Sequence, residues 1–233
     1  FSTGDEILSL GEPPREGAVY DSNRYTVFGM LSKLGVEIID MGVVRDDPRL
    51  LKAAFSKAAS QADAVITSGG VSVGEADHTK AMMRELGQVD FWRIAMRPGR
   101  PMAFGTLARE DGSNCMLFGL PGNPVAVMVT FLALVRPALL KMMGASKATA
   151  APAPLLQAQS LEHIRKKAGR TEYQRGIVSL NDSKQLVVRS TGSQGSGVLS
   201  SMVQANGLMV LGHEQGDVAI GDWVDVMMFE GAI

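Results

Sequence analysis

The chain has 233 residues and a formal net charge of −1, and hydrophobic residues make up 45% of it against 20% charged residues. This balance supports a packed core in one large or two smaller domains and excludes global disorder. The near-neutral charge gives no indication of nucleic acid or an anionic membrane as a partner. The single cysteine, Cys115, excludes an internal disulfide framework. With no secretory signal at the start, we expect a cytoplasmic protein.

Helices and strands are predicted to alternate along the first part of the chain. Residues 1–6, FSTGDE, are expected to end a strand that runs into a turn. Helical spacing of apolar residues, together with capping residues, predicts the helices, and short apolar runs predict the strands. The predicted helices cover residues 21–34, a stretch opened by Asp47 and Pro48, residues 78–86 and residues 125–143. The predicted strands cover residues 36–40, 63–70, 89–95 and 101–108 and the run CMLFGL that ends at 120.

The longest apolar run, residues 124–135, is followed by Arg136 and Pro137. It is shorter than the roughly 20 residues that a membrane span needs. We therefore interpret it as part of a buried core helix and expect no membrane partner.

The composition changes at residues 145–154, ASKATAAPAP, whose small residues and prolines are typical of a linker. Beyond it, short β-type runs separated by Gly, Asn and Asp predict a small all-β domain. The predicted organisation is an α/β domain with a mostly parallel sheet at residues 1–146, followed by an all-β domain at residues 152–233.

Three polar loops follow predicted strand ends, at residues 1–6, 67–77 and 120–124, and Asp46 follows another strand. In an open α/β sheet such loops lie on one rim, where ligands bind. Glycine N–H groups and hydroxyls suit phosphate oxygens, and carboxylates on the same rim suit a hard cation such as Mg²⁺ that bridges to the phosphate. One such loop alone can be only a tight turn with solvated acids, but three on one rim favour a ligand site.

The segment FWRIAMRPGRP, residues 91–101, places Arg93, Arg97 and Arg100 around a Pro-Gly turn. Arginine recognises oxyanions through a planar, forked set of donors. In isolation a solvated basic turn is the simpler interpretation, whereas beside an acidic rim the three arginines are a candidate anion clamp. The sequence contains no Ser-His-Asp arrangement, no phosphate-binding GxxxxGK[ST] loop and no zinc pattern.

Six motifs occur in order along the chain: STGDE, YDSN, GxxRDD, TSGGVSVGEAD, FWxxAMRPGxP and GLPGNPV. Together they resemble the molybdopterin molybdotransferase (MoeA) family, whose eukaryotic relative is the E domain of gephyrin. TEYQRG, TGSQGSGVLSSM and ANGLMVL resemble the C-terminal domain of that family. The resemblance covers essentially the whole chain. It implies a three-layer α/β domain of the molybdopterin-binding type, with its first strand missing, followed by a barrel-like all-β domain.

The resemblance also implies an activity, namely insertion of molybdenum from molybdate into adenylated molybdopterin, with Mg²⁺ and release of AMP. It implies a homodimer for the complete protein, with the adenylyltransferase that supplies the substrate as a further partner, and weak ligand binding by this chain alone. Residue by residue, the acids that it implies for catalysis and for the metal are Glu6, Asp46 and Asp77. The rim and the resemblance together give the predicted substrate-binding residues: Thr3, Ser68, Gly69, Gly70, Ser72, Gly74, Arg93, Arg97, Arg100, Pro121, Gly122, Asn123 and Pro124. Arginine at 93 and 97, where the family usually has lysine, keeps the charge but makes a forked contact.

Two alternative functions remain open. The molybdopterin adenylyltransferase shares this α/β fold and makes the adenylated pterin from ATP, but its glycine loop usually resembles TGGTG and it lacks the β tail. A scaffold is the alternative from a different class, as gephyrin is at synapses, where a groove beside the β tail binds receptor peptides. The SGGVSVGEAD loop and the tail favour the insertase, and the acidic rim makes any scaffold role an additional one.

Overall fold

The computed structural model describes residues 1–71 and 78–229, and its contacts divide the chain into two compact units. The first unit consists of Phe1–Ile94 and Gly99–Met128. The second consists of Ala95–Pro98 and Val129–Ile233. A short piece around residue 97 therefore belongs to the second unit, although its neighbours on both sides belong to the first. The domain limits predicted from the sequence, at residues 146 and 152, stay a prediction.

A six-stranded sheet in the order β4-β1-β5-β9-β8-β6 forms the centre of the first unit. The strands are β1 (Ser2–Thr3), β4 (Val43–Val44), β5 (Ala64–Ser68), β6 (Gly87–Arg93), β8 (Pro101–Ala108) and β9 (Asn114–Leu120). The first four in this order are parallel, and β8 and β6 run antiparallel to their neighbours. This confirms the mostly parallel α/β class. The two-residue strand β1 lies between β4 and β5.

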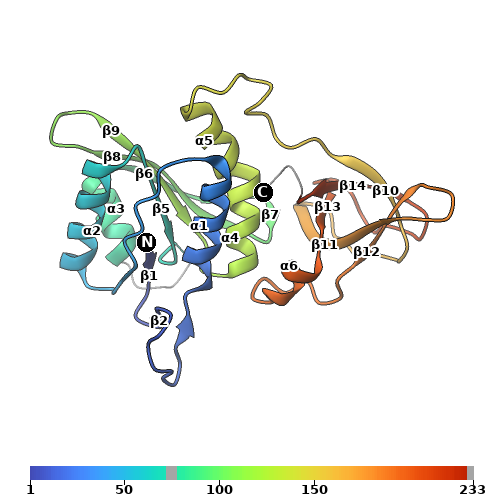
Figure 1. Ribbon diagram of the computed structural model, residues 1–233, viewed down its shortest axis with the longest axis horizontal. Helices are drawn as coiled ribbons and strands as arrows, with labels where there is room; N and C mark the ends of the chain where they lie inside the picture. The colour runs from blue at the N-terminus through green and yellow to red at the C-terminus, as the bar shows by residue number, and fades with distance from the viewer. Residues whose placement is uncertain (72–77, 230–233) are drawn as a thin grey trace. The chain divides into compact units, whose positions relative to one another are not determined.

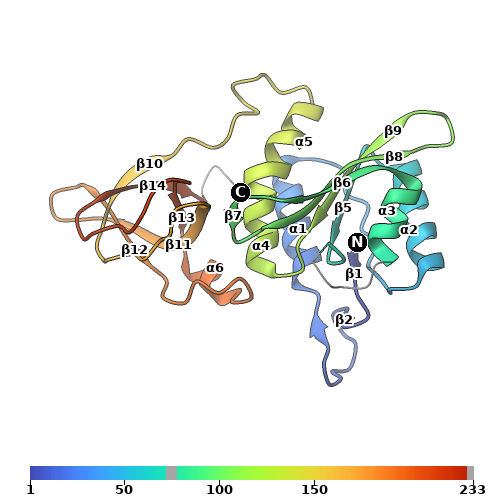
Figure 2. The same ribbon diagram turned by 180° about the vertical axis from the view of Figure 1, so that it is seen from behind.

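Helices cover both faces of this sheet, so that the first unit has three layers (Figures 1 and 2). One face carries α2 (Pro48–Gln61) and α3 (His78–Leu86), and the other carries α1 (Ser22–Leu34) and the start of α4 (Pro124–Thr130). Asp21 and Asp47 act as N-caps, because the side chain of Asp21 accepts the Arg24 N–H and that of Asp47 accepts two N–H groups of α2. A separate parallel pair joins β2 (Ile7–Leu8) to β3 (Val19–Tyr20).

The predicted strand at residues 36–40 is wrong, since the strand of this region is β4, Val43–Val44. Asp40 explains the shift: its carboxylate pairs with Arg24 of α1 at 2.6 Å and accepts the Gly42 N–H at 3.0 Å. Residues before Gly42 are thus tied to a helix instead of to the sheet.

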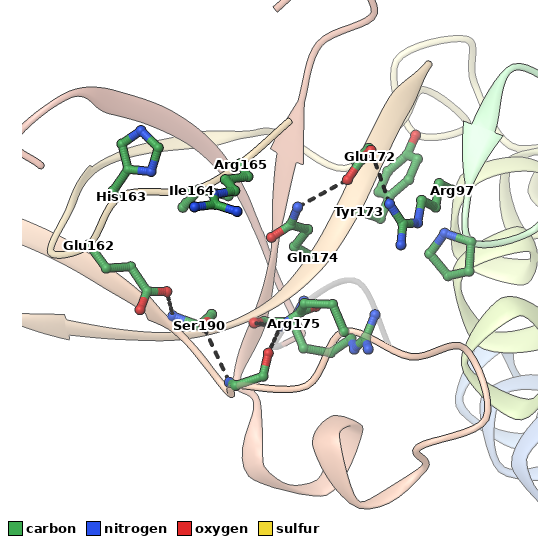
Figure 3. Close-up of a pocket in the computed structure, with 13 residues that line it drawn as sticks. Arg97, Glu162, His163, Ile164, Arg165, Glu172, Tyr173, Gln174, Arg175 and Ser190 are labelled. Carbon is green, nitrogen blue, oxygen red and sulfur yellow. Dashed lines mark hydrogen bonds and ion pairs between the residues drawn. The ribbon is translucent and has the colours of Figure 1, made fainter. Parts of the chain in front are cut away.

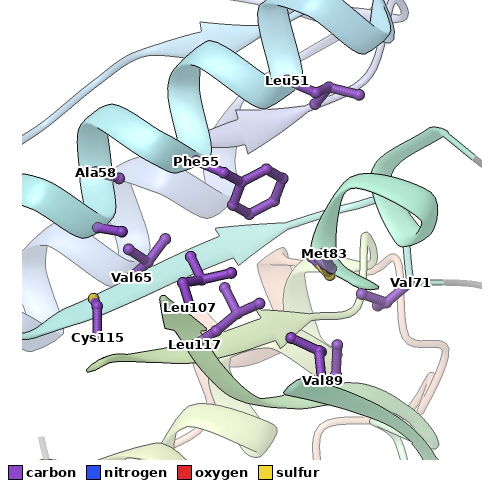
Figure 4. Close-up of a cluster of buried hydrophobic side chains, with 12 residues drawn as sticks. Leu51, Phe55, Ala58, Val65, Val71, Met83, Val89, Leu107, Cys115 and Leu117 are labelled. Carbon is purple, nitrogen blue, oxygen red and sulfur yellow. The ribbon is translucent and has the colours of Figure 1, made fainter. Parts of the chain in front are cut away.

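A core of fully buried side chains fills the space between the sheet and helices α2 and α3 (Figure 4). Leu51 and Phe55 of α2 pack against Met83 of α3 and against Leu117 of β9. Cys115 belongs to the same cluster, and burial raises the pKa of its thiol. A buried, neutral thiol fills space and does not serve as a nucleophile.

The predicted long helix at 125–143 consists of three parts: α4, a π-helical turn at Phe131–Val135 and α5 (Arg136–Met142). The Arg136 N–H donates to the carbonyl of Phe131, five residues back. Pro137 follows and has no N–H to donate, so a wider turn accommodates it. By length and composition alone, the segment Pro124–Met142 could cross a membrane. Half of the apolar stretch within it is buried inside the structure, as in the core helix of a globular protein.

The second unit contains a closed β-barrel with the strand order β12-β10-β14-β13-β11, in which β12 also pairs with β11. Its strands are β10 (Leu156–Ser160), β11 (Thr171–Leu180), β12 (Leu186–Ser190), β13 (Gly207–Leu211) and β14 (Trp223–Met228). The predicted all-β class is confirmed. Two elements were not predicted: a short helix, α6 (Ser200–Gln204), and strand β7 (Met96–Arg97), which pairs with the start of β11.

Candidate functional site

The ends of four parallel strands form a rim in the first unit. The pairing places Thr3 opposite Val44, and Ser68 opposite both Ser2 and Leu120. Because these strands are parallel, the loops that follow β1, β4, β5 and β9 leave the sheet at the same edge. The structure thus brings together the loops that carry the predicted site residues of this unit. Ser72, Gly74 and Asp77 lie outside the described residues.

Hydroxyl groups at the rim are used to join its strands. The Ser2 hydroxyl donates to the Asp21 carboxylate at 3.1 Å and lies 2.9 Å from the Ser68 hydroxyl. The Thr3 hydroxyl donates to the Ser68 carbonyl at 3.4 Å. Thr3 and Ser68, both predicted to bind substrate, are buried. In this structure their described contacts hold β1 against β5.

Two glycines after β5 allow the loop to approach its neighbours closely. Gly69 has a φ of +90°, and a Cβ there would lie 2.5 Å from the Thr3 carbonyl oxygen. Gly70 has a φ of +65°, and its Cβ would lie 2.7 Å from the Thr79 side chain of α3. The Gly69 N–H donates to the Leu120 carbonyl at 3.2 Å. Glycine is therefore required here by space and conformation, and that one N–H already has a protein acceptor.

Three carboxylates lie close together on the rim: Asp5, Glu6 and Asp46. The Asp46 N–H donates to a carboxylate oxygen of Asp5 at 3.3 Å. Burial raises the pKa of Asp46, and the negative charges of Asp5 and Glu6 raise it further, while His78 and the hydroxyl of Thr79 oppose the shift. Asp5 was missed at the sequence level, although it stands in the STGDE motif.

These acids offer hard oxygen donors of the type that Mg²⁺ prefers, and a cation would relieve the repulsion that raises the pKa of Asp46. In that sense Glu6 and Asp46 fit the predicted metal. Within residues 1–71 and 78–229, however, no group of three or more His, Cys, Asp or Glu side chains is arranged to hold a metal ion. The third predicted ligand, Asp77, is not among these residues.

The loop after β9 carries the four predicted residues Pro121, Gly122, Asn123 and Pro124. The Asn123 carbonyl accepts the Val127 N–H at 3.0 Å, which makes Asn123 the N-cap residue of α4, with Pro124 as its first residue. The Gly122 carbonyl accepts a hydrogen bond from the Asn23 side-chain amide at 2.7 Å. Asn23, of the YDSN motif, was not predicted as a site residue, but it holds this loop in place.

The three arginines of the predicted clamp do not belong to one unit. Arg93 and Arg100 lie in the first unit, where the Ile94 N–H donates to the Arg100 carbonyl at 2.8 Å. Arg97 lies in the second unit, in β7, opposite Glu172 of β11. A clamp formed by all three arginines stays a prediction.

Arg97 lines a cavity of about 280 Å³ at one end of the barrel (Figure 3). Its guanidinium lies 3.6 Å from the Glu172 carboxylate. The Gln174 amide donates to the other Glu172 oxygen at 3.0 Å. Arg175 and Gln194 also line this cavity.

Arg175 is the most unusual residue of this cavity, because it is only 1% exposed. Its guanidinium donates to the Ser201 hydroxyl at 3.0 Å, to the Gly195 carbonyl at 3.0 Å and to the Ser193 carbonyl at 3.3 Å. All these acceptors are neutral, and in the part of the chain that the structure describes no carboxylate forms an ion pair with Arg175.

Burial lowers the pKa of Arg175, and the positive charge of Arg97 lowers it further. Charged side chains are almost never fully buried without a counter-charge. Two like charges that face one cavity, one of them buried and without a carboxylate, favour an anion as the missing partner. No local pattern indicates this role of Arg175, which lies in the TEYQRG run.

The fold and these two polar regions define a class of protein, an α/β domain with an acidic, glycine-rich rim joined to a small barrel with a cationic cavity. Comparison with known families gives the particular family. A family model described as a "probable molybdopterin binding domain" matches residues 1–141, and the model of the MoeA C-terminal region (domain IV) matches residues 157–229. The chain therefore belongs to the family of molybdopterin-binding domains, with a MoeA C-terminal region behind that domain.

Similar proteins agree with this assignment. The chain is 46% identical over 229 residues to a molybdopterin molybdenumtransferase of Haemophilus influenzae, which covers 98% of this chain and 55% of the relative. It is 31% identical to a gephyrin of Dictyostelium discoideum over 98% of this chain and 36% of the relative. A solved molybdopterin biosynthesis MoeA protein from Pyrococcus horikosii superposes with a TM-score of 0.75 at 30% identity, covering 98% of this chain and 53% of that one. The chain thus spans about half the length of several relatives that it matches, and the resemblance inferred from its motifs is confirmed.

Proposed function

We propose that the complete protein inserts molybdenum from molybdate into adenylated molybdopterin, with Mg²⁺-dependent release of AMP. The observation that carries this proposal is the similarity along 98% of the chain, at 46% identity, to a protein named molybdopterin molybdenumtransferase. The match of residues 157–229 to a MoeA C-terminal region also argues against the adenylyltransferase alternative.

The rim of the first unit would hold the adenylated pterin. The loops after β5 and β9 supply the predicted binding residues, among them Gly69, Gly70 and Gly122, and backbone N–H groups of such loops suit phosphate oxygens. Glu6 and Asp46, with Asp77, would hold Mg²⁺ through carboxylate oxygens. When bound, the metal would neutralise charge at the phosphate bond whose cleavage releases AMP. Arg93 and Arg100 would contact the negatively charged substrate from the turn that joins β6 to β8.

The barrel cavity would hold molybdate. This assignment is supported by Arg175, whose buried guanidinium has only neutral partners, and by Arg97, which faces the same cavity. Molybdate is a dianion with oxygen atoms as acceptors, and forked N–H donors match such a group. We also propose that the complete protein is a cytoplasmic homodimer that receives its substrate from the adenylyltransferase.

The test is molybdenum insertion by the full-length protein and its Asp77→Asn variant. The variant keeps the shape of the side chain but loses its charge, so we expect insertion to be abolished. Asp111→Asn is the matched control, because Asp111 is exposed in the β8–β9 loop, at the edge of the sheet opposite the rim. Insertion at the normal rate by Asp77→Asn would show that the assigned acid is wrong.

A second measurement separates the alternative functions. Calorimetric titration with adenylated molybdopterin and, separately, with ATP, both with Mg²⁺, should show binding of the adenylated pterin without consumption of ATP. Turnover of ATP with unmodified pterin would instead indicate an adenylyltransferase. Absence of binding by the complete protein would favour the scaffold.

A further inference from the structure

The two arginines of the barrel cavity differ in their partners. Arg175 donates only to neutral oxygen atoms, whereas Arg97 has a carboxylate, Glu172, 3.6 Å from its guanidinium. The Glu172 side chain is only 6% exposed, and that of Arg97 is 59% exposed. The carboxylate is thus enclosed by protein, while the arginine that it neutralises is accessible from solvent.

The position of Glu172 is fixed from two directions. Strand pairing places it opposite Arg97, since β7 and β11 are parallel with Glu172 in register with Arg97. Its second carboxylate oxygen accepts the Gln174 amide N–H at 3.0 Å (Figure 3). Each oxygen therefore has a partner, and the carboxylate is held facing the cavity that is proposed to bind the oxyanion.

We propose that Glu172 is an internal competitor for the oxyanion. While the cavity is empty, the Glu172 carboxylate forms an ion pair with the Arg97 guanidinium, and an oxyanion that enters the cavity replaces the carboxylate as the partner of Arg97. Glu172 then sets the affinity of the cavity, because part of the attraction between Arg97 and the anion is offset by the lost ion pair and by repulsion from the carboxylate. This inference rests on the proposed function, which assigns molybdate to the cavity.

An opposite role for Glu172 is equally simple to state and gives the opposite result. If the carboxylate served to hold Arg97 in a binding geometry, its removal would weaken oxyanion binding. Removal of the Glu172 carboxylate should therefore raise the affinity for the oxyanion if Glu172 competes with it, and lower that affinity if Glu172 positions Arg97.

The experiment is calorimetric titration of sodium molybdate into the full-length protein and its Glu172→Gln variant. Glutamine keeps an oxygen that can accept the Gln174 hydrogen bond and removes the charge. We expect molybdate to bind about two- to fivefold more tightly, the range for one partly exposed ion pair. In the Arg97→Gln background the same change should give no such gain, because the pair no longer exists.

Glu162→Gln is the matched control, since Glu162 lines the same cavity but its carboxylate accepts the Ser190 N–H instead of pairing with an arginine. Removal of this charge should raise the affinity less than Glu172→Gln does. If Glu172→Gln does not fold, as checked by circular dichroism, Glu172→Asp replaces it. Its shorter side chain withdraws the carboxylate from Arg97, so the affinity should still rise.

The outcomes separate the two levels of the proposal. Unchanged or weaker binding by Glu172→Gln, with molybdate binding by the unaltered protein that depends on Arg175, would overturn the competitor role and leave the oxyanion site intact. Equal gains from Glu172→Gln and Glu162→Gln would also overturn it, because only the overall charge would matter. Absence of molybdate binding in every variant would overturn both the competitor role and the assignment of the cavity.

Discussion

Replacement of Arg175 by lysine should weaken molybdate binding and destabilise the barrel at the same time. The exchange keeps the positive charge and removes the forked set of donors. Arg175 is almost completely buried and donates three hydrogen bonds from two of its nitrogen atoms. A lysine ammonium on a flexible stem cannot reproduce that arrangement.

The expected magnitudes follow from these contacts. If lysine keeps one of the three hydrogen bonds, two of the acceptors lose their donor. A hydrogen bond contributes about 0.5–1.5 kcal/mol net, so we expect the free energy of unfolding to fall by roughly 1–3 kcal/mol. One charge-assisted hydrogen bond to the oxyanion, about 1.5–3 kcal/mol, corresponds to a loss of affinity of about ten- to hundredfold.

Urea denaturation followed by circular dichroism measures the first quantity, and calorimetric titration with molybdate measures the second. Arg189→Lys is the matched control, because Arg189 is exposed on β12 and does not line the cavity. It should change both quantities little. Wild-type molybdate affinity in a folded Arg175→Lys protein would refute the argument that this guanidinium is the anion ligand of the cavity.

Three further predictions concern the first unit. Gly69→Ala should lower the free energy of unfolding by about 2–4 kcal/mol in a denaturation experiment, because strain at positive φ adds to a clash with the Thr3 carbonyl of β1. Gly112→Ala, at a similar φ with nothing within 4 Å, should cost only about 1 kcal/mol. Equal losses in the two variants would contradict the close approach of Gly69 to β1. Asn23→Ala should destabilise the protein by about 1–2 kcal/mol and weaken AMP binding in calorimetry, because the Gly122 carbonyl in the loop after β9 loses its side-chain donor. An unchanged affinity for AMP would contradict the role of Asn23 in placing that loop. Phe55→Ala should lower the free energy of unfolding by about 3–5 kcal/mol in the same measurement, because the substitution leaves a cavity at a fully buried position. A loss below about 1 kcal/mol would mean that neighbouring core side chains move in to fill that cavity.

The parts of the fold that depend on local chemistry could be predicted from the sequence. Helices α1 and α2 follow from their N-caps, Asp21 and Asp47, and from apolar residues at helical spacing. The alternation of these helices with apolar strands was enough for the α/β class, and it placed three polar loops and Asp46 at one rim. Asn123 and Pro124 carry the same kind of local signal, an N-cap residue followed by a first-turn proline.

The parts that depend on distant partners could not be predicted. The segment at 36–40 has strand-like composition, but Asp40 binds Arg24 of α1, and no local pattern shows this contact. Likewise, three arginines around a Pro-Gly turn suggest one clamp, yet Arg97 pairs with Glu172, which is 75 positions further along the chain (97 to 172). Strand register across such a separation leaves no trace in a short window of sequence.

The burial of Arg175 shows why the cationic cavity in particular escaped sequence analysis. The residue lies in a strand, where an arginine ordinarily points to solvent. Here α6, a helix of only five residues, lies against it: the Ser201 hydroxyl donates its proton to the Val198 carbonyl at 2.6 Å and so presents a lone pair to the Arg175 guanidinium. A helix this short has no periodic pattern to detect, and its contact with β11 turns an ordinary strand arginine into a buried cation. The charge that makes the cavity suitable for an oxyanion is therefore created by packing, and it becomes visible only when the strand and its covering helix are seen together.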